Sequence, residues 1–130
     1  KSVISGNLLL QVLPGAWNDG MEELLGITPP DDRLGCLQDV HWYDGAWGYF
    51  PTYTLGAMTA AQLYHAAKQQ DSSIEAEISK GNFAPLLTWL RKNVHSKGRS
   101  VTPQGILIEA TGAPLNAEIF KNHLKTRYLS

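Results

Sequence analysis

The 130-residue sequence lacks several features that define whole classes of protein. Cys36 is its single cysteine, so no disulfide can form within the chain, and a lone thiol favours a reducing, cytoplasmic location. Its apolar runs are short, as in residues 8–10, and fall far below the ~20 residues that a membrane-spanning helix needs. No signal-peptide pattern is present at the start. These observations predict a protein without disulfides and without membrane spans.

A surplus of charge of either sign is also missing. The 11 basic and 12 acidic side chains give a net charge of -1, which leaves no basic excess to neutralise a phosphate backbone. Hydrophobic residues make up 43% and charged residues 18%, so a packed core is expected. The length suits one domain, predicted to span residues 1–130. Because the chain begins at Lys1 with an apolar pattern under way, it is either trimmed or part of something longer.

Strand patterns are nearly absent, and apolar residues recur at helical spacing along most of the chain. Pro14 and Gly26 are placed as helix start and stop signals, and Thr102-Pro103 and Gly112 form a second such pair. Ser72 or Ser73 is expected to cap a helix through its side chain. The predicted class is therefore all-α. The helices are expected near residues 14–25, 54–70, 73–78, 86–94, 103–111 and 116–128.

Residues 35–53 fit neither periodicity and are predicted to be an irregular, aromatic-rich segment. Half of the chain's 12 aromatic residues lie between Trp42 and Tyr53, interleaved with Gly45 and Gly48. Glycines there permit positive φ angles or close backbone approach. Polar groups among large rings, set between helices, are common in binding and catalytic loops. On chemistry alone the segment can equally be an aromatic core plug whose polar atoms pair internally.

The motifs in this segment resemble those of the Taq (thermostable) carboxypeptidases. Residues 35–42, Gly-Cys-Leu-Gln-Asp-Val-His-Trp, are similar to the family's G-x-x-Q-D-x-H-W motif, and residues 48–56 to its G-Y-F-P-T-Y-x-L-G stretch. Residues 13–18, 89–95, 110–112 and 124–128 also follow the family pattern in order. Two adjacent motifs at this spacing are a specific signal. Tyr43-Asp44 and Trp47 depart from the family's usual residues.

The resemblance implies the helical C-terminal part of a larger metallopeptidase catalytic domain that uses zinc. The family's zinc-binding H-E-x-x-H motif is not in this sequence, and no histidine has a His or Cys partner at chelating spacing. We therefore predict no metal ligands here, with zinc bound only in the intact enzyme and this chain inactive alone. His65, His95 and His123 are interpreted as surface or helix-end residues. Cys36 is interpreted as a small apolar filler.

By this resemblance, residues 35–56 line the cleft of an enzyme that releases single residues from peptide C-termini. The expected catalytic hydrogen-bond donors to the tetrahedral oxyanion are His41, Tyr49 and Tyr53. Gln38 and Asp39 are expected to orient His41 or to bind substrate backbone, and Trp42 to pack or to form a subsite wall.

The rival function is a non-catalytic helical module that binds a peptide or another subunit; an H-E-x-x-H motif in the intact protein would decide for the peptidase. Apolar surface left without partner helices favours a homodimer. Neither nucleic acid nor membrane is expected as a partner.

Overall fold

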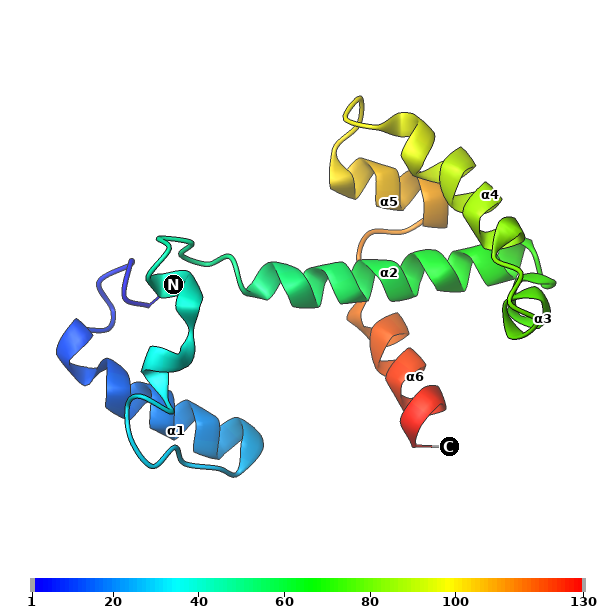
Figure 1. Cartoon of the computed structure of the whole chain (residues 1–130). Helices are drawn as coiled ribbons and strands as arrows, with labels where there is room; N and C mark the ends of the chain where they lie inside the picture. Colours follow the sequence, from blue (N-terminus) through cyan, green and yellow to red (C-terminus); the bar gives the residue numbers. More distant parts are fainter. Residues whose placement is uncertain (1, 130) are drawn as a thin grey trace. The chain divides into compact units, whose positions relative to one another are not determined.

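The computed structural model describes residues 2–129, and in that range every regular element is a helix, as the all-α prediction expects (Figure 1). The chain divides into two compact units, Lys1–Pro51 and Thr52–Ser130. Within the described range no helix is both long and apolar enough to cross a bilayer. The elements are η1 (Leu10–Val12), α1 (Leu13–Leu25), η2 (Cys36–Gln38), η3 (Val40–Trp42), α2 (Pro51–Gln70), α3 (Ile74–Ser79), α4 (Ala84–Asn93), η4 (His95–Lys97), α5 (Pro103–Thr111) and α6 (Ala117–Tyr128), where η marks a 3-10 helix.

In the first unit, α1 begins and ends at the predicted signals. Pro14 lies in its first turn, where a missing N–H costs no hydrogen bond. Gly26 follows the last turn in the left-handed conformation, with φ of 69°, and its N–H donates to the Glu22 carbonyl. A turn-rich loop returns the chain to Gly35, where an added Cβ would lie 3.2 Å from the Asp31 carbonyl oxygen and 3.3 Å from the Pro29 side chain. This close approach explains glycine at the start of the aromatic segment.

The aromatic segment is more regular than predicted. Two short 3-10 helices, η2 and η3, occupy much of residues 36–42, and α2 begins at Pro51 rather than after residue 53. A 3-10 turn needs only i→i+3 bonds, such as Gln38 N–H to Gly35 O and Tyr43 N–H to Val40 O, and leaves no periodicity to read in so short a piece. The positive φ expected of the glycines is present, with 69° at Gly45 and 74° at Gly48.

The second unit packs around α2. Its buried core consists of Ala66 and Ala67 of α2, Ile74 of α3, Trp89 of α4 and Ala110 of α5. Gln62 is 1% exposed, and its amide nitrogen donates to Thr111 Oγ1 and to the carbonyls of Ala113 and Pro114. Its amide oxygen accepts from the Asn116 N–H. The buried Gln62 side chain therefore links α2 through hydrogen bonds to the end of α5 and to the connection between α5 and α6.

Helix capping in the second unit follows the sequence at two of three sites. Thr102 accepts from the Gly105 N–H, and Asn116 accepts from the Glu118 N–H. Ser73 occupies the position before α3, but its side chain makes no capping bond. Instead both its backbone N–H and its hydroxyl donate to Asp71 Oδ1. Ser73 is therefore not the predicted cap, because its backbone is already helical, with φ of -75° and ψ of -20°, and its hydroxyl is turned toward Asp71.

Candidate functional site

The first unit brings polar chemistry together at η3, where Asp39 precedes the helix and His41 lies within it. Asp39 Oδ1 accepts from the His41 backbone N–H at 2.9 Å, which fixes the start of the 3-10 turn. The same oxygen lies 2.5 Å from His41 Nδ1. Both side chains are only 20% exposed, so the pair is held at the margin of the packed region rather than in open solvent.

The Asp39 carboxyl is ionised at neutral pH. Its partial desolvation raises its pKa, but hydrogen bonds from the His41 backbone, the His41 ring and the Trp42 side chain outweigh that effect and leave the pKa below its ordinary value. A carboxylate only accepts hydrogen bonds, so His41 Nδ1 carries the proton in this contact. The contact therefore fixes the orientation of the ring and places its Nδ1 proton toward the carboxylate.

Two further aromatic rings adjoin His41. The Tyr49 ring centroid lies 5.6 Å from that of His41, and Phe50 approaches it edge-on at 5.0 Å. Tyr49 itself is 49% exposed. These contacts confine the imidazole on the sides that Asp39 does not cover. They follow from the glycine turns that reverse the chain between η3 and α2.

Trp42 packs rather than projecting alone. Its ring meets Trp17 of α1 at 6.4 Å and Trp47 at 5.3 Å, both edge-on. A cavity of about 150 Å³ opens beside these rings and beside the Asp39–His41 pair. It is lined by Val3, Ile4, Asp39, His41, Trp42, Ala46, Trp47, Gly48, Phe50 and Pro51. Trp42 therefore packs against two other indole rings and also lines this cavity, and its expected role as a substrate subsite wall stays a prediction.

The remaining candidates lie elsewhere. The Gln38 side chain is exposed, and its amide donates to the Arg33 carbonyl at 2.8 Å. Tyr53 lies in the first turn of α2, in the second unit, with 56% of its surface exposed. Cys36 is 5% exposed, as expected of an apolar filler. The structure therefore gathers Asp39, His41, Trp42 and Tyr49 into one place.

Sequence reasoning missed two contributors to this place, Trp17 and Phe50. Both fall within the stretches that carry the family resemblance, and that is the signal that could have marked them. Trp17 reaches Trp42 from a different helix, and Phe50 reaches His41 across a glycine turn. Neither contact follows from sequence spacing alone.

Metal ligands do not converge in this part of the molecule. Across residues 2–129, no three His, Cys, Asp or Glu side chains gather as a metal ion would require. The zinc that the motifs imply has no fitting donor set among these residues, because a catalytic zinc takes three protein ligands. The described residues around η3 provide hydrogen-bonding groups and an apolar cavity instead.

Comparison with known proteins shows that the chain is similar to part of several carboxypeptidases. The chain is 41% identical over 129 residues to thermostable carboxypeptidase 1 of Pyrococcus furiosus, and 39% identical over 128 residues to carboxypeptidase 1 of Bacillus subtilis. These matches cover 99% and 98% of this chain but 26% of each relative, so the chain spans about a quarter of their length. Trypanosoma cruzi metallocarboxypeptidase 1 superposes with a TM-score of 0.93 at 38% identity, over 99% of this chain and 27% of that one.

The resemblance found in the motifs is confirmed by these matches. The family model described as carboxypeptidase Taq (M32) metallopeptidase matches residues 1–128, almost the whole chain. The structural match extends that agreement from the sequence to the backbone. The chain belongs to the carboxypeptidase Taq (M32) family of metallopeptidases.

Proposed function

We propose that this chain forms the C-terminal portion of a metallocarboxypeptidase and supplies contacts to the substrate and to the transition state. The observation that carries the proposal is the Asp39–His41 pair beside an apolar cavity. The ionised Asp39 carboxylate holds one edge of the His41 imidazole, and a cavity lined by aromatic rings lies beside the pair. This arrangement suits a histidine that donates a hydrogen bond to a substrate carbonyl. Family membership and the carboxypeptidase names of the relatives support the reaction class.

His41 is assigned as the donor to the developing oxyanion. Attack on the scissile carbonyl places negative charge on its oxygen, and a preorganised donor stabilises that charge without reorganising. With Nδ1–H held by Asp39, a protonated Nε2 donates to the oxyanion, and the Asp39 carboxylate stabilises the resulting positive ring. Asp39 is a positioning residue in this scheme, because it acts through His41.

The cavity beside Trp42 is assigned to a substrate side chain. Its volume of about 150 Å³ and its walls of indole and phenyl rings suit an apolar residue near the scissile bond. Tyr49 and Tyr53 remain proposed donors, and Gln38 a proposed contact to substrate backbone. Zinc remains the proposed metal of the intact enzyme, held by residues outside this chain.

The test is steady-state kinetics of His41→Ala in the full-length protein. A donor that acts in the transition state costs about 10²–10³-fold in kcat when removed, with little change in KM. Metal content should stay unchanged. His95→Ala is the matched control, since His95 is exposed in η4 and lines none of these cavities. Full activity of His41→Ala would return the segment to a packing role.

The 130 residues on their own are proposed to be inactive. They lack a metal-ligand set, so added zinc should not bind tightly, and a blocked dipeptide should release no C-terminal residue. Isothermal calorimetry and an amino-acid release assay measure the two. Stoichiometric, sub-micromolar zinc binding would contradict this expectation.

Self-association and location are further proposals. Large apolar side chains of this chain are exposed, including Leu24 at 80% and Ile4 at 69%, and such surface, left without partner helices, favours self-association of the chain. We propose that the chain forms a homodimer and that the protein is cytoplasmic. Light scattering on the 130-residue chain measures the mass, and a monomer at micromolar concentration would contradict the dimer.

A further inference from the structure

The Trp42 indole lies beside the Asp39–His41 pair, on the same 3-10 turn. Asp39 immediately precedes η3 and Trp42 is the last residue of η3, so the two are three residues apart. A 3-10 helix has three residues per turn, and side chains at i and i+3 therefore eclipse each other. The Trp42 backbone N–H donates to the Asp39 carbonyl at 3.3 Å, which closes this turn. The backbone therefore places the indole next to the carboxyl group.

The Asp39 carboxylate needs more than its two contacts with His41 to be held in one orientation. The His41 backbone N–H and His41 Nδ1 both approach the same oxygen, Oδ1. Rotation about the last side-chain bond of an aspartate is only weakly restricted, so contacts to one oxygen do not fix the plane of the carboxylate. The Trp42 side chain supplies a third hydrogen bond to this carboxyl group. Its only donor is the indole N–H, which is therefore the further point of attachment.

The Trp42 ring is itself held by two other indoles. Trp17 of α1 meets it edge-on, with 6.4 Å between ring centroids and 65° between ring planes. Trp47 meets it at 5.3 Å and 61°. Edge-to-face packing is a preferred geometry of aromatic pairs. Because Trp17 comes from a separate helix, its contact restricts the tilt of the Trp42 indole in a way that the η3 backbone alone does not.

We propose that Trp42 is a positioning residue, which holds the Asp39 carboxylate through its indole N–H and thereby orients the His41 ring. This inference rests on the proposed role of His41 as the donor to the oxyanion. In this role Trp42 acts through Asp39 rather than on the substrate. Loss of the N–H should therefore lower kcat and leave KM unchanged, whereas loss of a cavity wall would raise KM.

Replacement of Trp42 by benzothienylalanine in the full-length enzyme tests the proposal. This amino acid keeps the shape of the indole and its contacts with Trp17 and Trp47, but carries sulfur in place of the N–H. We expect kcat to fall about 3–10-fold, less than for loss of the carboxylate itself, with KM unchanged. The same replacement at Trp89 is the matched control, because the Trp89 indole N–H donates to Gln70 Oε1 at 2.8 Å in the core of the second unit. There the thermal midpoint should fall and kcat should stay the same.

A double-mutant cycle shows whether Trp42 acts through Asp39. In an Asp39→Ala background the benzothienylalanine replacement should lower kcat no further, because no carboxylate remains to be positioned. Equal effects on kcat at Trp42 and Trp89 would overturn the proposal. An undiminished effect of the Trp42 replacement in the Asp39→Ala background would do so as well.

Proton NMR of the His41 ring separates this inference from the proposed function. The Nδ1 proton in contact with the Asp39 carboxylate should give a downfield resonance, which should broaden when Trp42 loses its N–H and disappear in Asp39→Ala. That result, together with full activity of His41→Ala, would contradict the catalytic role of His41 and support the positioning role of Trp42. A resonance that the Trp42 replacement leaves unchanged, together with impaired His41→Ala, would overturn the positioning role alone.

Discussion

The two compact units use hydrogen bonds for different purposes. In the second unit, Gln62 is 1% exposed and both ends of its amide are occupied by partners from the α5–α6 connection. In the first, Asp39 and His41 form an equally definite contact, yet each remains 20% exposed beside a cavity. A fully buried and satisfied polar network fixes one packing arrangement. A partly exposed pair fixes the orientation of a group that solvent can still reach.

The comparison predicts that changes at Asp39 act on catalysis. In the full-length enzyme, Asp39→Asn should lower kcat about 10–100-fold, the usual cost of losing a carboxylate that orients a functional histidine. The thermal midpoint at neutral pH should fall only slightly, through loss of the carboxylate's hydrogen bonds, so the effect on kcat is the larger one. Asp39→Glu should recover part of kcat, because it restores the charge. A variant that lost stability and kept kcat would place Asp39 with the structural network instead.

The same carboxyl should also make stability depend on pH. Because the folded-state pKa of Asp39 is lowered, its hydrogen bonds stabilise the fold above the unfolded pKa, near 3.8, and that contribution disappears as pH falls through the lower folded value. Wild type and Asp39→Asn should therefore differ most at neutral pH and converge in acid. Denaturant titrations at a series of pH values measure this.

Changes at Gln62 should act on stability. Gln62→Leu removes the acceptor of the Asn116 N–H and the donors to Ala113 and Pro114, and unpaired buried groups cost about 1–3 kcal/mol. Urea unfolding of the full-length protein measures the loss. For the folded enzyme kcat should be unchanged. The neighbouring exposed Gln69→Leu is the control, and an equal loss there would contradict the assignment.

The smallest expected difference lies between the two tyrosines. Tyr53 lies in the first turn of α2, where a rigid backbone suits a preorganised donor, and Tyr49 follows Gly48, whose φ is positive. Tyr53→Phe should lower kcat by about tenfold with little effect on KM, and Tyr49→Phe should change both, as expected of a residue that closes over substrate. A larger effect confined to kcat at Tyr49 would reverse the assignment.

The features that could be predicted from the sequence are those that depend on interactions between residues close together in the chain. Gly26, Thr102 and Asn116 marked helix ends because a cap needs only its own turn. Ser73 misled because its backbone is helical at that position and its hydroxyl donates to Asp71, two residues away, instead of capping α3. Asp39 was expected to orient His41, and the structure places the two in contact over that short spacing.

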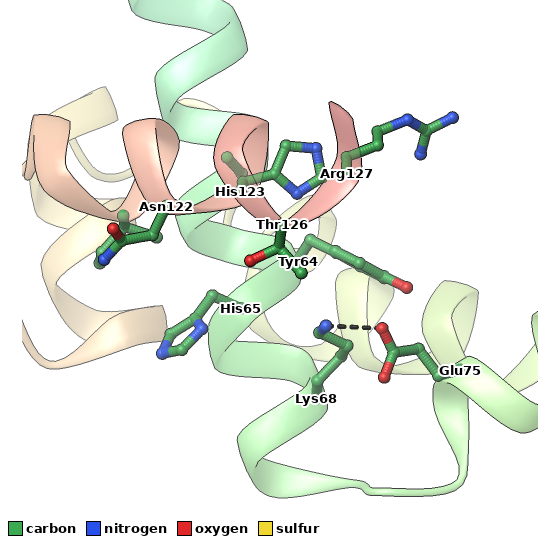
Figure 2. A pocket seen from close by; sticks show the side chains of 10 residues that line it. Tyr64, His65, Lys68, Glu75, Asn122, His123, Thr126 and Arg127 are labelled. Carbon is green, nitrogen blue, oxygen red and sulfur yellow. Dashed lines mark hydrogen bonds and ion pairs between the residues drawn. The ribbon is translucent and has the colours of Figure 1, made fainter. Parts of the chain in front are cut away.

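Longer-range packing was beyond sequence reasoning. Gln38 had the same expected role as Asp39, but its amide reaches the Arg33 carbonyl instead. His65 and His123 were interpreted as surface or helix-end residues, and the structure shows that both line one cavity (Figure 2). Trp17 meets Trp42 from a separate helix. Such contacts depend on how helices pack, and no spacing along the chain encodes them directly.

The most direct test of the central claim is the affinity of a transition-state analogue. A phosphonate analogue of a blocked dipeptide carries the tetrahedral, negatively charged centre that His41 is proposed to stabilise, whereas the blocked amino acid released by cleavage of that dipeptide lacks it. In the full-length enzyme, His41→Ala should weaken phosphonate binding by the same factor as it lowers kcat/KM, about 10²–10³, and leave product binding unchanged. Equal weakening of phosphonate and product, or no weakening of either, would contradict the account.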